Sequence, residues 1–170
     1  MTFKRLVLGV LILPFLFVCN LHQTPLNSEL SKAPKQDVDL VFQSGWAIEV
    51  TDENFGERYG YTTPVAGLTD YGNKIIHIKE DRINRALLHE IGHVLDYECG
   101  LPSQTEEFHQ IYVVEKQRFV DCTSVNDRHE IVNEKEYFAS VYQNIILNYE
   151  DTVRNVPRTV EFIERELNHV

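Results

Sequence analysis

The sequence predicts an α+β domain in which a small group of strands precedes a helical C-terminal half. Residues that favour β-structure are concentrated between positions 39 and 79, and apolar residues recur with a helical period from about position 81 onward. With 170 residues and 43% hydrophobic content, the chain is large enough for one domain with a buried core. The boundary between the two patterns falls just before the most informative segment, residues 87–96.

The overall charge limits the classes of partner. The formal net charge is −10, which argues against a nucleic-acid partner because phosphate binding requires a basic surface. The chain contains no internal repeat and no low-complexity tract. We therefore expect one acidic domain, with at most a mild attraction for cationic peptides.

The first 19 residues have the pattern of a signal peptide or membrane-targeting segment. Lys4 and Arg5 precede an apolar run over residues 6–18, which is too short for a comfortable membrane span. No small residues mark a good cleavage site, and the residues before Cys19 resemble a bacterial lipobox only loosely. We expect an exported protein, secreted or extracellular, and membrane attachment through an uncleaved segment or a lipidated Cys19 is the alternative.

The rest of the chain is predicted to comprise a linker and one folded domain. Residues 20–37 are rich in Gln, Pro, Ser, Lys and Asn without a period, which predicts a linker, and residues 38–170 form the domain. Cys99 and Cys122 lie inside this domain. As an even pair they are compatible with a disulfide in an oxidising compartment, and two free, buried thiols are an equally good interpretation.

Two parts of the first half are predicted to form strands. Residues 39–51 contain Val, Ile, Phe and Trp and are interpreted as a strand or strand pair with a break at Gly45. Residues 65–68 and 74–79 flank the turn-forming tetrad 70–73, which predicts a β-hairpin. The second arm directly precedes the next helix, so it is either an edge strand that can pair with an extended peptide or an ordinary sheet strand.

Several helices are predicted from position 81 onward. Asp81 is the expected N-cap of the first helix, which should end near Gly100 because glycine suits a C-terminal cap and the following Pro102 prevents continuation. The helices are predicted over residues 81–98, from Ser103 or Thr105 to about 119, from the cap Asn133 to 147, and over 158–168, with a loop over 121–132.

The segment 87–96 contains an H-E-x-x-H motif formed by His89, Glu90 and His93. Residues four apart leave the same face of a helix about one turn from each other, so the two imidazoles can bind one cation. Glu90 projects beside them, where it can take a proton from a water on that cation. The alternative is that both histidines are hydrogen-bonded core residues, but such a polar group on a buried face is costly unless it has partners. The sequence therefore predicts a metal site.

The identity of the third ligand is open from spacing alone. A catalytic zinc ion commonly takes three protein ligands and leaves one position for water. The metzincin pattern H-E-x-x-H-x-x-G-x-x-H fails here because Asp96 and Cys99 stand at its glycine and third-histidine positions. The remaining candidates are carboxylates from later helices, namely Glu106, Glu107, Glu134 and Glu136.

The motif H-E-I-G-H-V-L-D at 89–96, together with N-E-K-E-Y-F-A at 133–139, resembles the catalytic domain of the anthrax lethal factor family, which includes secreted Pro-Pro endopeptidases. The family motifs are similar to H-E-x-G-H-x-x-D and N-E-x-E-F-F-A, and the resemblance covers roughly residues 65–147. It implies an α+β, zincin-like metallopeptidase domain of gluzincin type, with a small mixed sheet packed on the active-site helix. It also implies that Glu136 is the third zinc ligand.

Two positions depart from the family pattern. The family has a tyrosine before the second motif that hydrogen-bonds the oxyanion, and His129 stands at the matching position. An imidazole N–H also donates to an oxyanion, so His129 is the expected replacement. The family has an acidic residue one turn after the zinc-binding glutamate, where this chain has Ser140. Ser140 and Asp96 are therefore candidates only for supporting a ligand or for packing.

The resemblance implies an exported zinc metalloendopeptidase. Zn²⁺ is expected to be bound by His89, His93 and Glu136, with Glu90 as general base and later proton donor, and with His129 or a nearby tyrosine assisting at the oxyanion. A monomer that cleaves protein or peptide substrates near proline is the expected form. The alternatives are a catalytically weak or inactive binding module of the same fold at the cell surface, and a membrane-anchored structural protein without a bound metal.

Overall fold

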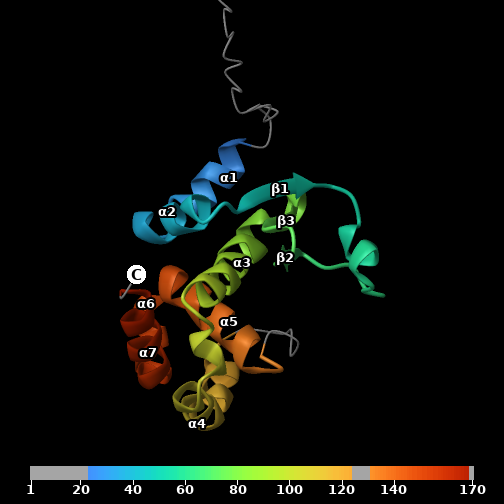
Figure 1. Ribbon diagram of the computed structural model, residues 1–170. Coiled ribbons are helices and arrows are strands. Elements are labelled where there is room, and N and C mark those ends of the chain that lie inside the picture. Colours follow the sequence, from blue (N-terminus) through green and yellow to red (C-terminus); the bar gives the residue numbers. More distant parts are fainter. Residues whose placement is uncertain (1–22, 124–130, 169–170) are drawn as a thin grey trace, which may run out of the picture.

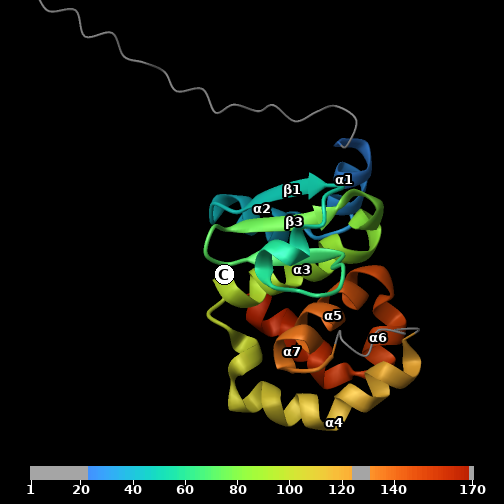
Figure 2. The same cartoon turned by 90° about the vertical axis from the view of Figure 1, so that its right-hand side faces the viewer.

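Helix α3 (Ile83–Glu98) lies at the centre of the fold. The computed structural model describes residues 23–123 and 131–168. Two N-terminal helices and the strands lie on one side of α3, and the later helices lie on the other (Figures 1 and 2). This arrangement confirms the predicted α+β class with a helical C-terminal half. The other elements are α1 (Gln23–Leu30), α2 (Lys35–Gln43), β1 (Ala47–Thr51), η1 (Phe55–Tyr59), β2 (Gly67–Asp70), β3 (Ile75–Lys79), η2 (Glu80–Arg82), η3 (Pro102–Gln104), α4 (Glu106–Cys122), α5 (Glu134–Leu147), α6 (Tyr149–Asn155) and α7 (Pro157–Leu167), where η denotes a 3₁₀ turn.

The three strands form a mixed sheet in the order β1-β3-β2. β1 is parallel to β3, with Ile48 opposite Ile76, and β2 and β3 form an antiparallel hairpin in which Thr69 is opposite the same Ile76. The hairpin prediction is therefore confirmed. The suggestion that residues 74–79 form an edge strand is wrong, because β1 occupies the second hydrogen-bonding side of β3. β2 is instead the edge strand of the hairpin.

Both faces of the sheet are covered at β3. Ile76 and Ile78 are buried in the core that includes α3. His77 points to the opposite face, as alternation along a strand requires, and is also buried. There the ring of Phe55 lies 5.5 Å from the His77 ring, and the Tyr59 hydroxyl lies 2.9 Å from His77 Nε2. The connection between β1 and β2 thus covers the outer face of the sheet (Figure 2).

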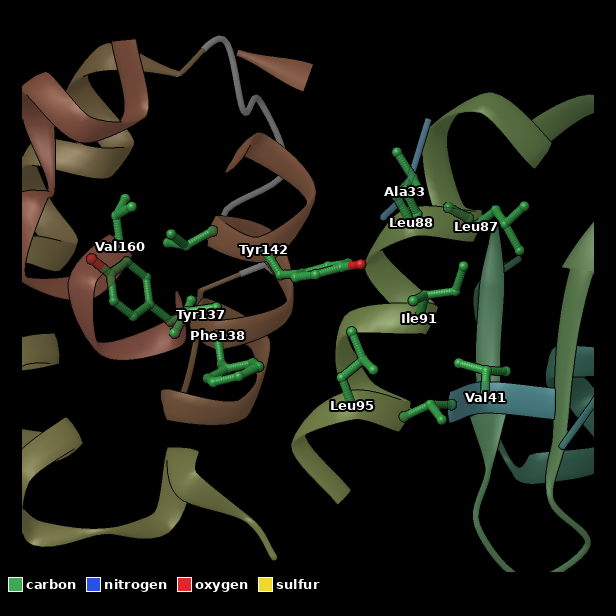
Figure 3. Close-up of a cluster of buried hydrophobic side chains, with 14 of the residues drawn as sticks. Ala33, Val41, Leu87, Leu88, Ile91, Leu95, Tyr137, Phe138, Tyr142 and Val160 are labelled. Atoms are coloured by element: carbon green, nitrogen blue, oxygen red, sulfur yellow. The ribbon is translucent and has the colours of Figure 1, made fainter. Parts of the chain in front are cut away.

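The largest buried cluster fills the space around α3 (Figure 3). Fully buried Tyr137 and Phe138 of α5 form one side of this cluster, and Tyr142 extends from α5 toward α3. Burial of large side chains is the main stabilising contribution to such a domain. The α3 residues that Figure 3 labels within the cluster are Leu87, Leu88, Ile91 and Leu95.

Helices α3 and α5 meet closely at Gly92. A Cβ at this position would lie 2.8 Å from Cα of Ala139 and 3.2 Å from its carbonyl oxygen. The absence of a side chain at Gly92 therefore allows the two backbones to touch. His89 and His93 flank this contact on α3, and Glu136 lies one turn before Ala139 on α5. The contact therefore sets the separation between these three side chains.

The residues predicted to be a linker, 20–37, are partly folded. α1 begins at Gln23 and packs against α3, and α2 begins at Lys35. Ala33 and Asp37 are buried, and Asp37 Oδ2 accepts a 2.7 Å hydrogen bond from the Tyr142 hydroxyl. The linker prediction is therefore wrong for residues 23–37. A few apolar residues in this polar segment, too sparse to show a period, attach it to the core.

The first strand is also shorter than predicted. Residues up to Gln43 belong to α2, and only Ala47–Thr51 is extended, because the positive φ of 86° at Gly45 separates the helix from the strand. The predicted break at Gly45 is confirmed. Helix α6 was not predicted, because its seven residues are too few to show a helical period.

Most predicted helix ends agree with the structure. Gly100 has a φ of 83° just after α3, Thr105 accepts a hydrogen bond from Phe108 N, and Asn133 accepts one from Glu136 N. The N-cap prediction for Asp81 is wrong. The chain leaves β3 through the η2 turn, which contains Asp81, and no side chain caps the start of α3.

The predicted targeting segment, residues 1–19, lies outside the described residues. Across residues 23–123 and 131–168, none of the helices combines the length and the apolar content that a membrane span needs. Cys99 and Cys122 are both free, which agrees with the free-thiol interpretation, but the expectation that they are buried is wrong because Cys99 is half-buried and Cys122 is exposed.

We expect Gly92→Ala to lower the free energy of unfolding by about 2 kcal/mol. Overpacking against a backbone costs about 3 kcal/mol, and the gain in helix propensity returns about 1 kcal/mol. Urea denaturation followed by circular dichroism measures the change. Gly72→Ala is the control, since a Cβ there would meet only Asp70 Oδ1 at an ordinary 3.4 Å. Equal stability of the two variants would contradict the role of Gly92.

Asp37 should make a pH-dependent contribution to stability. Burial raises the pKa of Asp37 above its ordinary value of 3.8, although the hydrogen bond from Tyr142 opposes this shift. The folded protein then binds more protons than the unfolded chain, so this contribution to stability falls as the pH rises above 3.8 through the folded pKa. We expect Asp37→Asn, which can still accept from Tyr142, to lose less stability than wild type between about pH 3 and about pH 6. Parallel urea titrations would contradict this if both proteins showed the same change with pH.

Candidate metal centre

Two elements bring the metal-ligating side chains together. His89 and His93 project from α3 with ring centroids 4.7 Å apart, and Glu136 projects from the first turn of α5. Glu136 Oε2 lies 3.2 Å from His89 Nε2 and 3.3 Å from His93 Nε2. One ligand atom from each of the three residues lies within 4.8 Å of the other two. The predicted histidine pair therefore shares its site with one of the four candidate glutamates.

The remaining candidate glutamates contact other side chains. Glu134, two residues before Glu136, turns to the surface of α4, where its carboxylate lies 2.6 Å from His109 Nδ1. His109 is exposed. The two glutamates at the start of α4 have surface partners, namely Gln110 for Glu106 and Arg165 for Glu107.

The distances from Glu136 to the two imidazoles suit one tetrahedral ion. Zinc binds imidazole nitrogen at about 2.0–2.1 Å and carboxylate oxygen at about 2.0–2.2 Å, so two ligand atoms of a tetrahedral ion stand about 3.3 Å apart. The separations of 3.2 and 3.3 Å from Glu136 Oε2 to the two imidazole nitrogens agree with this value. His89, His93 and Glu136 can therefore hold a metal ion.

The surroundings keep the Glu136 carboxyl ionised, which is the form that binds a metal ion. Burial raises the pKa of this carboxyl, but the hydrogen bonds and charges of His89 and His93 outweigh it and hold the pKa far below the ordinary value. Asn133 Oδ1 also accepts a 3.0 Å hydrogen bond from Glu136 N, which fixes the first turn of α5. A carboxylate at a helix N-terminus is further favoured by the helix dipole.

The far sides of the two imidazoles have different environments. Ser140, buried one turn after Glu136, places its Oγ 3.4 Å from His89 Nδ1, within hydrogen-bond distance of this ring. The buried Nδ1 of His93 has no hydrogen-bond partner within the described residues. Asp96 does not support it. Asp96 instead accepts hydrogen bonds from Ser103 N at 2.8 Å and Ser103 Oγ at 2.6 Å, which hold the η3 turn.

Glu90 is turned toward the edge strand β2. Only 6% of its surface is exposed, and its Oε2 accepts a 2.7 Å hydrogen bond from the Thr69 hydroxyl. The Glu90 side chain also fills the space that a Cβ at Gly67 would occupy. Neither Thr69 nor Gly67 is predicted from the sequence. A glycine and a threonine two residues apart before a turn were the only sequence signal.

A tyrosine from the hairpin turn also lies near the centre. The ring of Tyr71 lies 5.1 Å from the ring of Tyr97 on α3, and Lys135 Nζ lies 5.9 Å from its centroid. Burial, followed by the negative charges of Glu90, Asp96 and Glu136, raises the pKa of Tyr71, so its hydroxyl keeps its proton. His129, the predicted oxyanion donor, lies outside the described residues.

Comparison with known proteins agrees with this geometry. A family model described as anthrax toxin lethal factor, N- and C-terminal domain, matches residues 73–166, more than half of the chain and including both segments of the metal group. No match was found among curated proteins. The family domain is zincin-like, and the family includes zinc metalloproteases. The chain therefore belongs to the anthrax toxin lethal factor family.

Proposed function

We propose that this protein is a zinc-dependent metalloendopeptidase. The observation that supports it best is that His89, His93 and Glu136 form one group that could hold a metal ion, with Glu90 next to His89 on the same helix. Membership of a family that includes zinc metalloproteases supports the same function. A purely structural metal site has no need for the additional carboxylate of Glu90.

The proposed chemistry divides between the ion and the protein. His89, His93 and Glu136 would bind Zn²⁺ and leave a coordination position open. Bound zinc supplies the Lewis acidity that activates a water and polarises the scissile carbonyl. Glu90 takes a proton from the attacking water and gives it to the leaving amine as the C–N bond breaks. His129 or Tyr71 donates a hydrogen bond to the oxyanion.

We propose that an extended peptide binds along β2. Its outer edge carries no strand among the described residues, and it lies against α3 at Glu90. Backbone hydrogen bonds to such an edge give affinity without demanding one sequence. Lys135, the residue before Glu136, lines a surface hollow together with His109 and Glu134. We propose that this hollow accepts substrate side chains. Cleavage near proline is proposed from the family resemblance alone.

Export is proposed on the sequence pattern of residues 1–19. The two basic residues and the following apolar run are the basis for secretion, with membrane attachment through this segment as the alternative. The acidic net charge supports a protein or peptide substrate over a nucleic acid.

We expect Glu136→Ala to weaken zinc binding by more than about 100-fold, since loss of a ligand should exceed the loss of a supporting group. Competition with a chromophoric chelator measures the affinity. Glu134→Ala is the matched control, because it removes a glutamate from the same helical turn that pairs with His109 instead. Similar zinc affinities for the two variants would contradict the assignment of Glu136.

We expect the zinc-loaded protein to cleave a peptide library and Glu90→Gln to lower kcat/KM by about 10²- to 10⁴-fold, because the amide cannot accept the proton. Mass spectrometry of the products also reports whether cleavage occurs near proline. Glu161→Gln, an exposed site on α7, is the control. Absence of cleavage by wild type, Glu161→Gln and Glu90→Gln alike would support the binding module instead.

A further inference from the structure

The carboxylate of Glu90 is held by the edge strand β2. The Thr69 hydroxyl lies 2.7 Å from Glu90 Oε2 and 3.3 Å from the Glu90 carbonyl oxygen. Both partners are acceptors when Glu90 is ionised, so the single hydroxyl proton of Thr69 points toward Glu90. In the described part of the chain, no other side chain donates a hydrogen bond to this carboxylate.

Gly67 provides the space for the same carboxylate. A Cβ at Gly67 would lie 2.7 Å from Glu90 Oε1, 2.8 Å from Glu90 Cγ and 3.0 Å from Ala86 Cβ. Gly67 and Thr69 are two residues apart and therefore face the same side of β2. Their partners across the hairpin, Ile78 and Ile76, are buried in the core with α3. One carboxylate oxygen thus lies over a residue without a side chain, and the other is hydrogen-bonded.

We infer that Thr69 and Gly67 are positioning residues for Glu90, which orient its carboxylate toward the attacking water. This inference rests on the proposed peptidase function. A flexible glutamate has three rotatable side-chain bonds, and orienting it in advance favours proton transfer. Because β2 is also the proposed substrate strand, the element that binds the peptide would orient the general base.

The kinetic test compares Thr69→Val with Thr69→Ser in the zinc-loaded full chain. Valine has nearly the same shape and favours a strand but has no hydroxyl, so we expect kcat to fall about 10- to 100-fold while KM stays within about threefold. Serine keeps the hydroxyl and should restore most of kcat. Thr62→Val, at an exposed site in the connection before β2, should behave as wild type. A wild-type kcat in Thr69→Val, an equal loss in Thr69→Ser, or a loss confined to KM would overturn the inference.

A structural measurement tests the inference without activity. Crystal structures of the zinc-loaded wild type, Thr69→Val and Gly67→Ala should show the Glu90 carboxylate displaced in both variants, because one loses the hydrogen bond and the other fills the space. Zinc affinity should stay within about threefold of wild type, since neither variant changes a ligand. An unmoved Glu90 would overturn the inference. Failure of wild type to cleave any peptide would refute the proposed function separately, and the crystallographic comparison would still decide the position of Glu90.

Discussion

The contact between α3 and α5 at Gly92 is the constraint on which the metal centre depends. Helix axes usually lie about 8–10 Å apart, according to the side chains between them. Here the space for a Cβ at Gly92 is taken by the Ala139 backbone, so α5 approaches to the near limit. Glu136 then reaches both imidazoles with one oxygen, at 3.2 and 3.3 Å. On the other side of α5, the buried rings of Tyr137 and Phe138 pack against Phe108 of α4 and attach α5 to the helical C-terminal half.

The geometry of an α-helix explains why the motif faces two different elements. Successive residues are turned by about 100°, so His93 projects about 40° from His89, whereas Glu90 projects about 100° from it. The two histidines therefore face α5, and Glu90 faces β2, where the Thr69 hydroxyl donates a hydrogen bond to it. In the proposed mechanism, metal binding would require the contact with α5, and proton transfer would additionally require the contact with the sheet.

The elements predicted well were those with a local signal. The hairpin has a turn tetrad, Asn133 precedes an acidic first turn, and Gly100 ends α3 with a positive φ. The histidine pair follows from helical spacing alone, whereas Glu136 was selected among four glutamates by family resemblance. Local patterns do not predict which face of α5 packs on α3. In the structure Glu136 lies on that face, whereas Glu134 points toward α4.

The features that were missed depend on contacts between distant segments. α1 and the start of α2 are helical because a few of their apolar residues pack into the core. Asp37 also accepts a hydrogen bond from Tyr142, more than a hundred residues later in the sequence. The order of the sheet is another case. β1 pairs with β3, although the connection that covers His77 and then β2 lie between these two strands in the sequence. Neither the sparse apolar residues nor the strand order leaves a periodic pattern in the sequence.

The region matched by the family begins at residue 73, after β2 has ended at Asp70. The matched region therefore includes the metal group on α3 and α5 but not Gly67 and Thr69. The relation of these two residues to Glu90 follows only from their distances to its side chain. A metal group inside the matched region is thus combined with an edge strand outside it. Under the proposed function a substrate backbone would lie along β2, so this one strand would both bind the peptide and orient the general base through Gly67 and Thr69.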